Sequence, residues 1–180
     1  MLTVVPPLQE ILPDGGLRRG SVLCLSGEVG STSLLLALLS GPMAEGSWAA
    51  VVGLPGLGVE AAAGLGVALE RLVLVPRPGA AWLEAVAALL DAVDLVAIGS
   101  PGRCRPGDAR RLAARARERG AVLLVRHTWP ERADLSLEVS APHWSGLNAG
   151  HGTLTRRRVT VRCARAGRAR ERQLWLPGEP

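Results

Sequence analysis

Residues 21–39, SVLCLSGEVGSTSLLLALL, decide the fold of this chain. A short aliphatic run leads into a glycine-rich turn, and a second apolar run of helical length follows at once. Uninterrupted aliphatic runs are typical of strands that are buried on both faces. The stretch therefore predicts a strand at 21–26 and a buried helix at 32–39, and Gly41-Pro42 predicts the end of that helix.

The same alternation of short aliphatic runs and helical patterns continues to residue 125. We expect further strands at 48–52, 72–75, 95–98 and 121–125, with helices between them at 59–67, 81–91 and 108–119. Strands interleaved with helices indicate an α/β fold whose mostly parallel sheet is flanked by helices on both sides, with right-handed crossovers.

The pattern changes after about residue 128. Residues 135–140 and 158–163 alternate apolar and polar side chains, as strands with one exposed face do. A turn at 164–169 around Gly167 precedes a last short run at 172–176. We therefore expect antiparallel C-terminal strands at the edge of the sheet.

Composition allows one domain with a sizeable core. The chain has 180 residues, of which 48% are hydrophobic, and it contains no Phe or Tyr, so the core must be aliphatic. All 21 basic residues are arginine. Selection for phosphate contacts is one explanation. The codon usage of a GC-rich genome is the other, and the abundance of Ala, Gly and Pro favours it.

The charge is unevenly distributed along the chain. Residues 1–98 carry four arginines and nine acidic residues, a net charge of −5, whereas residues 99–180 carry seventeen arginines and seven acidic residues, a net charge of +10. Such asymmetry indicates that the C-terminal half contacts nucleic acid or an acidic protein surface, or that it is a solvated face.

Cysteine usage and the N-terminus bear on the compartment. Cys24, Cys104 and Cys163 form no CxxC pair, and the N-terminus lacks the pattern of a secretion signal. The longest uncharged stretch, at 47–59, is broken by glycine and proline and is too short to span a membrane. We expect a cytoplasmic protein.

Residues 25–33 stand between the first strand and the first helix, where a phosphate-binding loop belongs. A working loop, GxxxxGK[ST], holds phosphates with backbone N–H groups and a lysine, and its hydroxyl binds magnesium. Here a serine occupies the lysine position, and its hydroxyl donates only one neutral hydrogen bond. The two glycines also lie three residues apart instead of five. The pattern indicates a plain strand–turn–helix connection or a vestigial phosphate loop made of Gly27, Gly30, Ser31, Thr32 and Ser33.

The wider frame resembles the RecA superfamily. In those proteins an apolar helix and a Gly-Gly-Leu turn lead to the first strand, and 15–20 (GGLRRG) match that turn. Residues 48–53, 92–100 and 123–127 resemble the following strands, in the correct order. The resemblance covers about residues 8–130. It implies one degenerate RecA-like domain over the whole chain, with a lead-in segment (1–20), a parallel α/β core (21–128) and an antiparallel basic extension (129–180).

The departures from the RecA pattern share one direction. Ser31 replaces the phosphate lysine, the loop 53–56 (GLPG) replaces the catalytic acid, and Gly99 replaces the magnesium-site Asp. His127 falls near the position of a nucleotide-sensing residue. Phosphoryl transfer depends on positioned cations and metal ions. We therefore expect a protein that is not an enzyme, with no nucleotide cofactor and no metal.

Within the superfamily the chain resembles the actinobacterial ImuA-prime proteins, chiefly at 30–35 (GSTSLL) and 92–96 (AVDLV). That resemblance implies a non-catalytic accessory or adaptor protein of the mutasome, the complex for error-prone translesion DNA synthesis in the SOS response to DNA damage. The partners it implies are an inactive Y-family-like polymerase subunit of the ImuB type and an error-prone replicative-type polymerase of the DnaE2 type. The alternatives are a divergent RecA-like ATPase that uses Ser31 and Thr32, and a single-stranded DNA-binding protein.

The C-terminal arginines are the most distinctive charged feature. On an alternating strand Arg158, Thr160 and Arg162 share one face. A contact with DNA or with an acidic partner is one interpretation, and an edge strand protected by charges is the other. The cluster comprises Arg156, Arg157, Arg158, Arg162, Arg165, Arg168, Arg170 and Arg172.

Two other patterns suggest little chemistry. The three histidines, His127, His143 and His151, have neither tight spacing nor a nearby cysteine pair, so they predict no zinc site. The charged helix expected at 108–119 is typical of a solvated helix that lies on a sheet.

Overall fold

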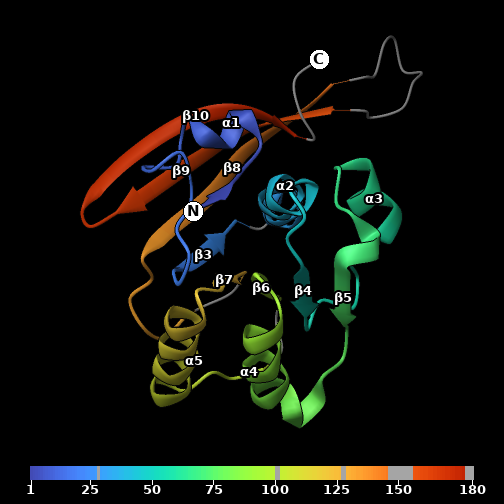
Figure 1. Cartoon of the computed structure of the whole chain (residues 1–180). Helices are drawn as coiled ribbons and strands as arrows, with labels where there is room; N and C mark the ends of the chain where they lie inside the picture. The colour runs from blue at the N-terminus through green and yellow to red at the C-terminus, as the bar shows by residue number, and fades with distance from the viewer. Residues whose placement is uncertain (28, 100–101, 127–128, 146–155, 177–180) are drawn as a thin grey trace.

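The computed structural model describes residues 1–27, 29–99, 102–126, 129–145 and 156–176 (Figure 1). Its strands are β1 (Leu2–Thr3), β2 (Gly16–Leu17), β3 (Val22–Ser26), β4 (Ala49–Val52), β5 (Leu72–Val75), β6 (Leu95–Ile98), β7 (Val122–Val125), β8 (Leu135–Ser145), β9 (Arg156–Arg165) and β10 (Arg168–Leu176). Its α-helices are α1 (Pro6–Gln9), α2 (Ser31–Ala44), α3 (Val59–Gly64), α4 (Trp82–Ala92) and α5 (Pro106–Arg119), with 3-10 turns η1 (Leu69–Arg71) and η2 (Gly79–Ala81).

Eight strands form one mixed sheet in the order β10-β9-β8-β3-β7-β6-β4-β5. The pairs from β8 to β5 are parallel, and β9 and β10 are antiparallel to their neighbours. The expected fold class, a mostly parallel α/β sheet with antiparallel C-terminal strands, is confirmed. Antiparallel pairing begins one strand later than expected, because β8 lies parallel to β3.

Helices cover both faces of the sheet and create two cores. Helices α1, α2 and α3 lie on one side, and α4 and α5 lie side by side on the other (Figure 1). All residues of β4, β6 and β7 are buried, which explains why their sequences lack an apolar–polar alternation. The first core includes Leu34, Leu38 and Leu124, and the second includes Val86, Leu112 and Leu123.

Helix α2 does not end at Gly41-Pro42 as the sequence suggests, but continues to Ala44. Gly41 does not end the helix, and its lack of a side chain allows close packing against the N-terminal segment. A Cβ at Gly41 would lie 2.7 Å from Cα of Val4 and 2.8 Å from the backbone nitrogen of Val5. Pro42 falls in the last turn of the helix and has no N–H to donate to the carbonyl oxygen of Leu38, and the helix ends two residues later.

The N-terminal segment closes over this helix. Strands β1 and β2 pair in a small antiparallel ladder, with Leu2 opposite Leu17, and Leu8 of α1 is fully buried in the first core. This ladder has no clear signal in the sequence, since each strand has only two residues.

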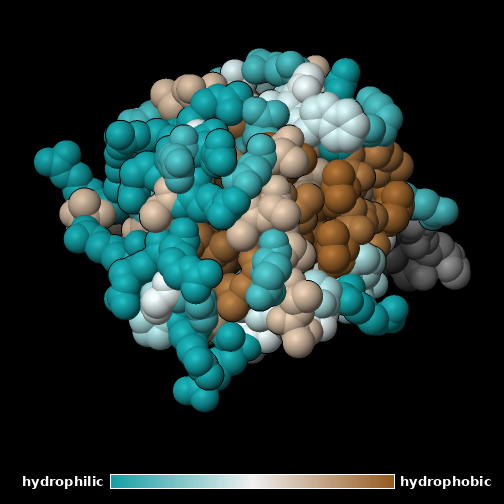
Figure 2. Space-filling model, turned by 60° about the horizontal axis from the view of Figure 1, so that its bottom comes forward, coloured by the Kyte–Doolittle hydropathy of each residue, from teal (hydrophilic) through white to brown (hydrophobic). Residues whose placement is uncertain are grey.

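Strand β5 forms the edge of the sheet opposite β10, and this edge is apolar and partly exposed. None of the four residues of β5 is buried, and Leu74 is 36% exposed. Figure 2, which brings α4 and α5 toward the viewer, shows hydrophilic residues on one side of this face and an apolar area on the other. No helix within the described residues is both long and apolar enough to cross a membrane.

Candidate functional site

The vestigial phosphate loop lies where the sequence predicts it, between β3 and α2. Gly30 is the N-cap of α2 with a left-handed φ of 102°, and Ser31 is the first helical residue. Gly27 has a φ of 117°, and a Cβ there would collide with the carbonyl oxygen of Val139 in β8. The start of the loop is therefore held against the neighbouring strand, and only glycine fits. Glu28 lies outside the described residues.

The hydroxyl at the lysine position is already engaged. Ser31 is only 2% exposed, and its Oγ accepts a hydrogen bond of 3.0 Å from Nε of Arg126. Arg126 follows β7, and its backbone N–H donates to the carbonyl oxygen of Ile98 over 2.9 Å, which fixes the base of the side chain. Burial limits the contact of this hydroxyl with a phosphate, whereas the bond from Arg126 occupies only one acceptor position of its oxygen. Thr32 and Ser33 follow in the first turn of α2, both half-buried.

The two positions that carry acids in RecA proteins face each other across a closed contact. A Cβ at Gly99, after β6, would lie 2.5 Å from the carbonyl oxygen of Gly53 and 3.0 Å from Cβ of Leu54. Gly53 follows β4 and turns the chain with a φ of 70°. Its N–H donates to the carbonyl oxygen of Val75 over 2.9 Å. The structure therefore has no room for a carboxylate at position 99 unless the loop at 53–54 moves.

The groups that phosphoryl transfer uses in RecA proteins are changed at these positions. Arg126 brings a cation to the loop, but a serine holds it, and the acid positions are occupied by glycine. The described residues contain no group of three or more His, Cys, Asp or Glu able to hold a metal ion. His127 and His151 lie outside those residues, and the side chain of His143 is not described.

Arg126 is the residue of this site that sequence reasoning missed. Its position just before His127 at the end of a predicted core strand is a signal, because side chains at the carboxyl ends of parallel strands gather at one edge of the sheet. Its partner, Ser31, is 95 residues away in the sequence, so no local pattern predicts that the two residues form a pair.

The structure divides the C-terminal arginine cluster between two faces of one hairpin. Val159, Val161 and Cys163 of β9 are buried, and Arg158 and Arg162 are exposed on the other face, as the alternation predicts. The cross-strand partners of Arg158 and Arg162 are Trp175 and Glu171, so these four residues form what we call the outer face.

The outer face is largely balanced in charge. The guanidinium of Arg158 lies over the ring of Trp175, 5.6 Å from its centroid, and Arg162 lies 3.8 Å from a carboxylate oxygen of Glu138. Glu171 is directly opposite Arg162. The tryptophan therefore contacts an arginine of its own sheet, a cation–π pair.

The remaining arginines of the cluster lie elsewhere. Arg165 bonds Asp14 of the N-terminal segment over 2.7 Å. Three exposed residues of β10 form what we call the arginine row, Arg168, Arg170 and Arg172, and no ion pair reaches them within the described part of the chain. Arg156 and Arg157 belong to β9, but the structure does not describe their side chains.

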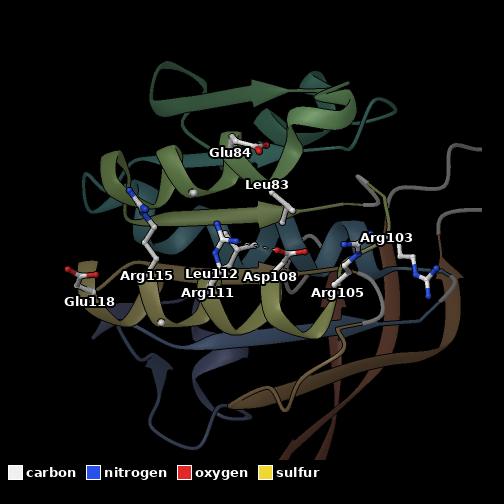
Figure 3. A pocket seen from close by; sticks show the side chains of 11 residues that line it. Leu83, Glu84, Arg103, Arg105, Asp108, Arg111, Leu112, Arg115 and Glu118 are labelled. Atoms are coloured by element: carbon white, nitrogen blue, oxygen red, sulfur yellow. Dashed lines mark ion pairs between the residues drawn. The ribbon is translucent and has the colours of Figure 1, made fainter.

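A groove of about 760 Å³ runs between α4 and α5 (Figure 3). Its apolar lining comes from Leu83, Ala87 and Leu112, and Figure 3 shows Arg103 and Arg105 at one end. Ion pairs tie the two helices together beside the groove, because Arg115 and Arg119 of α5 both contact Asp91 of α4. These arginines lower the pKa of Asp91, chiefly through the hydrogen bond from Arg115.

The cysteines do not resemble nucleophiles. Burial raises the pKa of Cys24 to about 11, and burial also raises the pKa of Cys163 despite the nearby charges of Arg170 and Arg165. A catalytic thiol needs a lowered pKa.

The fold has relatives of known structure. The crystal structure of the RadB recombinase superposes with a TM-score of 0.67 over 97% of this chain and 94% of that chain, at 17% sequence identity. This similarity shows that the fold is RecA-like.

The sequence has relatives too. The uncharacterized protein Rv3395c of Mycobacterium tuberculosis (strain ATCC 25618 / H37Rv) is 41% identical over 119 residues, which are 64% of this chain and 57% of that protein. The match thus spans little more than half the length of this relative. The sequence model of the MT3502 N-terminal domain matches residues 10–131, and this chain, with its RecA-like fold and its closed phosphate loop, belongs to that family.

Proposed function

We propose that this protein is a non-catalytic accessory protein that uses a RecA-like fold as a binding scaffold. The observation that carries the proposal is the closed phosphate loop. Ser31, at the position of the phosphate lysine, is buried and bonded to Arg126. Its burial keeps this hydroxyl away from the place where the lysine of a working loop meets the terminal phosphates.

The acid positions support the same conclusion. Magnesium in such sites is held by carboxylates, and a carboxylate also orients the attacking group. A Cβ at Gly99 would collide with the backbone of Gly53, so an aspartate at the position of the metal ligand has no space there. A nucleotide at this loop would meet one cation, Arg126, but no carboxylate at position 99 to hold a metal ion.

The biological role that we propose is support of error-prone translesion synthesis in the response to DNA damage. It rests on the resemblance to the ImuA-prime proteins at 30–35 and 92–96. In this role the protein would link an inactive Y-family-like polymerase subunit of the ImuB type to an error-prone replicative-type polymerase of the DnaE2 type. The net charge of +10 on residues 99–180 favours an acidic partner surface or DNA as one of the contacts.

ATP turnover tests the first part of the proposal. Purified protein should show no magnesium-dependent hydrolysis of ATP above a buffer blank, and Thr32→Ala should change nothing. Arg126→Ala removes the cation beside the loop and should also leave the rate at background. Magnesium-dependent turnover that Thr32→Ala abolishes would instead establish a divergent ATPase and end the proposal.

Co-purification tests the second part. A tagged chain from DNA-damaged cells should bring down the inactive polymerase-like subunit, identified by mass spectrometry, and the chain with Ser31→Lys should bring it down equally well. Recovery of that subunit only by a chain with bound nucleotide, or recovery of DNA with no protein, would contradict the adaptor role.

A further inference from the structure

Strand β10 is a long edge strand whose register is fixed by a tight turn. It pairs with β9 from Arg168 to Leu176 and ends the order of the sheet. The turn between the two strands is Ala166-Gly167, and both residues have positive φ, 48° and 82°. That combination defines a two-residue type I′ hairpin, whose closing pair is Arg165 opposite Arg168.

The closing pair decides which backbone groups of β10 are free. In an antiparallel ladder hydrogen-bonded pairs alternate with non-bonded pairs. Counting from the closing pair, every second residue of β10 turns its N–H and C=O away from β9. These residues are Ala169, Glu171, Gln173 and Trp175. The strand thus offers a further strand four residues with unpaired backbone groups.

The arginine row stands along this edge on one face. Arg168, Arg170 and Arg172 alternate with the four residues above, and their cross-strand partners are Arg165, Cys163 and Val161. Residues two apart on a strand are separated by roughly 6.6–6.8 Å. A strand added to this edge repeats its own same-face side chains at the same interval, so three alternate carboxylates would meet three guanidinium groups.

We propose that β10 takes up an extended acidic segment of a partner protein as an added strand. The inference deepens the proposed adaptor function and rests on it for the existence of a protein partner. Backbone pairing along the edge supplies affinity, and the arginine row supplies selectivity for acidic residues at alternate positions.

The geometry favours an acidic peptide over DNA. The outer face beside the edge holds Glu171, and Glu138 lies next to Arg162, so a phosphate backbone that extended from the arginine row onto the outer face would meet carboxylates. Trp175, which a single-stranded base would need for stacking, contacts Arg158 on that same outer face and not on the face of the arginine row.

The test uses a fluorescein-labelled peptide of alternating glutamate and threonine, with anisotropy measured at low ionic strength. The peptide should bind the full chain. The variant Arg168→Glu/Arg170→Glu/Arg172→Glu should bind it roughly tenfold to hundredfold more weakly, because three surface ion pairs are reversed. The control variant Arg111→Glu/Arg158→Glu/Arg162→Glu makes the same change in net charge elsewhere and should stay within about twofold of the parent.

A proline separates strand addition from simple charge attraction. Gln173→Pro removes an N–H that points away from β9, so it spares the native ladder and blocks the added one. It should weaken binding roughly tenfold, whereas Gln173→Ala should not. Thermal unfolding of each variant shows whether it is folded. If the Gln173→Pro variant does not fold, the arginine-row variant and its control decide the test.

Three results would overturn the inference: no binding of the peptide to the parent chain, equal loss in the control variant, or normal binding by a folded Gln173→Pro variant. Binding of a single-stranded oligonucleotide in place of the peptide, lost in the arginine-row variant, would make nucleic acid the ligand of this edge and would also overturn it. The ATP assay on the same proteins is independent, so failure of the peptide test leaves the absence of catalysis to be judged separately.

Discussion

A single methyl group at Gly99 should destabilise the protein markedly. Its ideal Cβ would lie 2.5 Å from the carbonyl oxygen and 2.9 Å from the carbonyl carbon of Gly53. Ordinary contact begins at 3.4 Å, so the backbone at Gly53 must retreat by about 0.9 Å, the difference between 3.4 and 2.5 Å. Overpacking in a tight site costs about 1–3 kcal/mol. The two nearest atoms belong to the backbone of Gly53, which moves less easily than a side chain, so we expect Gly99→Ala to cost about 2–3 kcal/mol. For a domain of this size the melting temperature should fall by roughly 4–12 °C.

Urea and thermal unfolding followed by circular dichroism measure this change. The matched control is Gly56→Ala, in the loop that contains Gly53, where a Cβ would meet nothing within 4 Å. It should change the free energy of unfolding by less than about 0.5 kcal/mol. If the two variants were equally stable, the contact between Gly53 and Gly99 would not be tight enough to exclude a side chain at position 99, and this reasoning would be refuted.

Three further predictions follow from the site and its surroundings. Arg126→Ala should lower the free energy of unfolding by about 1–2 kcal/mol, because it leaves the buried hydroxyl of Ser31 without its charged donor, and urea titration beside Ser31→Ala checks this. Cys24, with a pKa of about 11 against an ordinary value of 9.0, should be alkylated by iodoacetamide about a hundredfold more slowly than a free cysteine at pH 8, as measured by mass spectrometry over time. Comparable rates would contradict its burial. Asp91→Asn should lower stability at pH 7, because its folded pKa lies below the unfolded one. The stabilisation is therefore present above about pH 4. The difference from the parent should shrink as the pH falls further, and a difference that persists at pH 2 would exclude an ionic origin.

Local patterns predict the parallel core well because each strand is a continuous aliphatic run and each helix has its own period. Helix α5 begins at Pro106, two residues before the expected start, since proline is well suited to the first turn of a helix. The alternation in β9 correctly separates Val159 and Val161 from Arg158 and Arg162.

Contacts between distant segments account for what the sequence could not predict. Gly41 signals a helix end when its neighbours alone are considered, and only the approach of Val4 reveals its role in packing. The bond from Arg126 to Ser31 joins residues 95 apart. The arginine cluster appears as one basic run in the sequence, yet the tight turn at Ala166 sends its members to opposite faces of the sheet.

The central position of β3 has a consequence for how the chain folds during synthesis. Its two neighbours are β7 and β8, and Val22 pairs with Leu123, about a hundred residues later. At the usual rates of translation roughly 5–20 seconds separate the appearance of these partners. A nascent chain therefore carries an aliphatic strand with two unsatisfied edges for that time, and we expect this long-range pairing to slow folding. A fragment that stops at residue 131 would still leave one edge of β3 bare, so the segment that includes β8 is needed to complete the sheet.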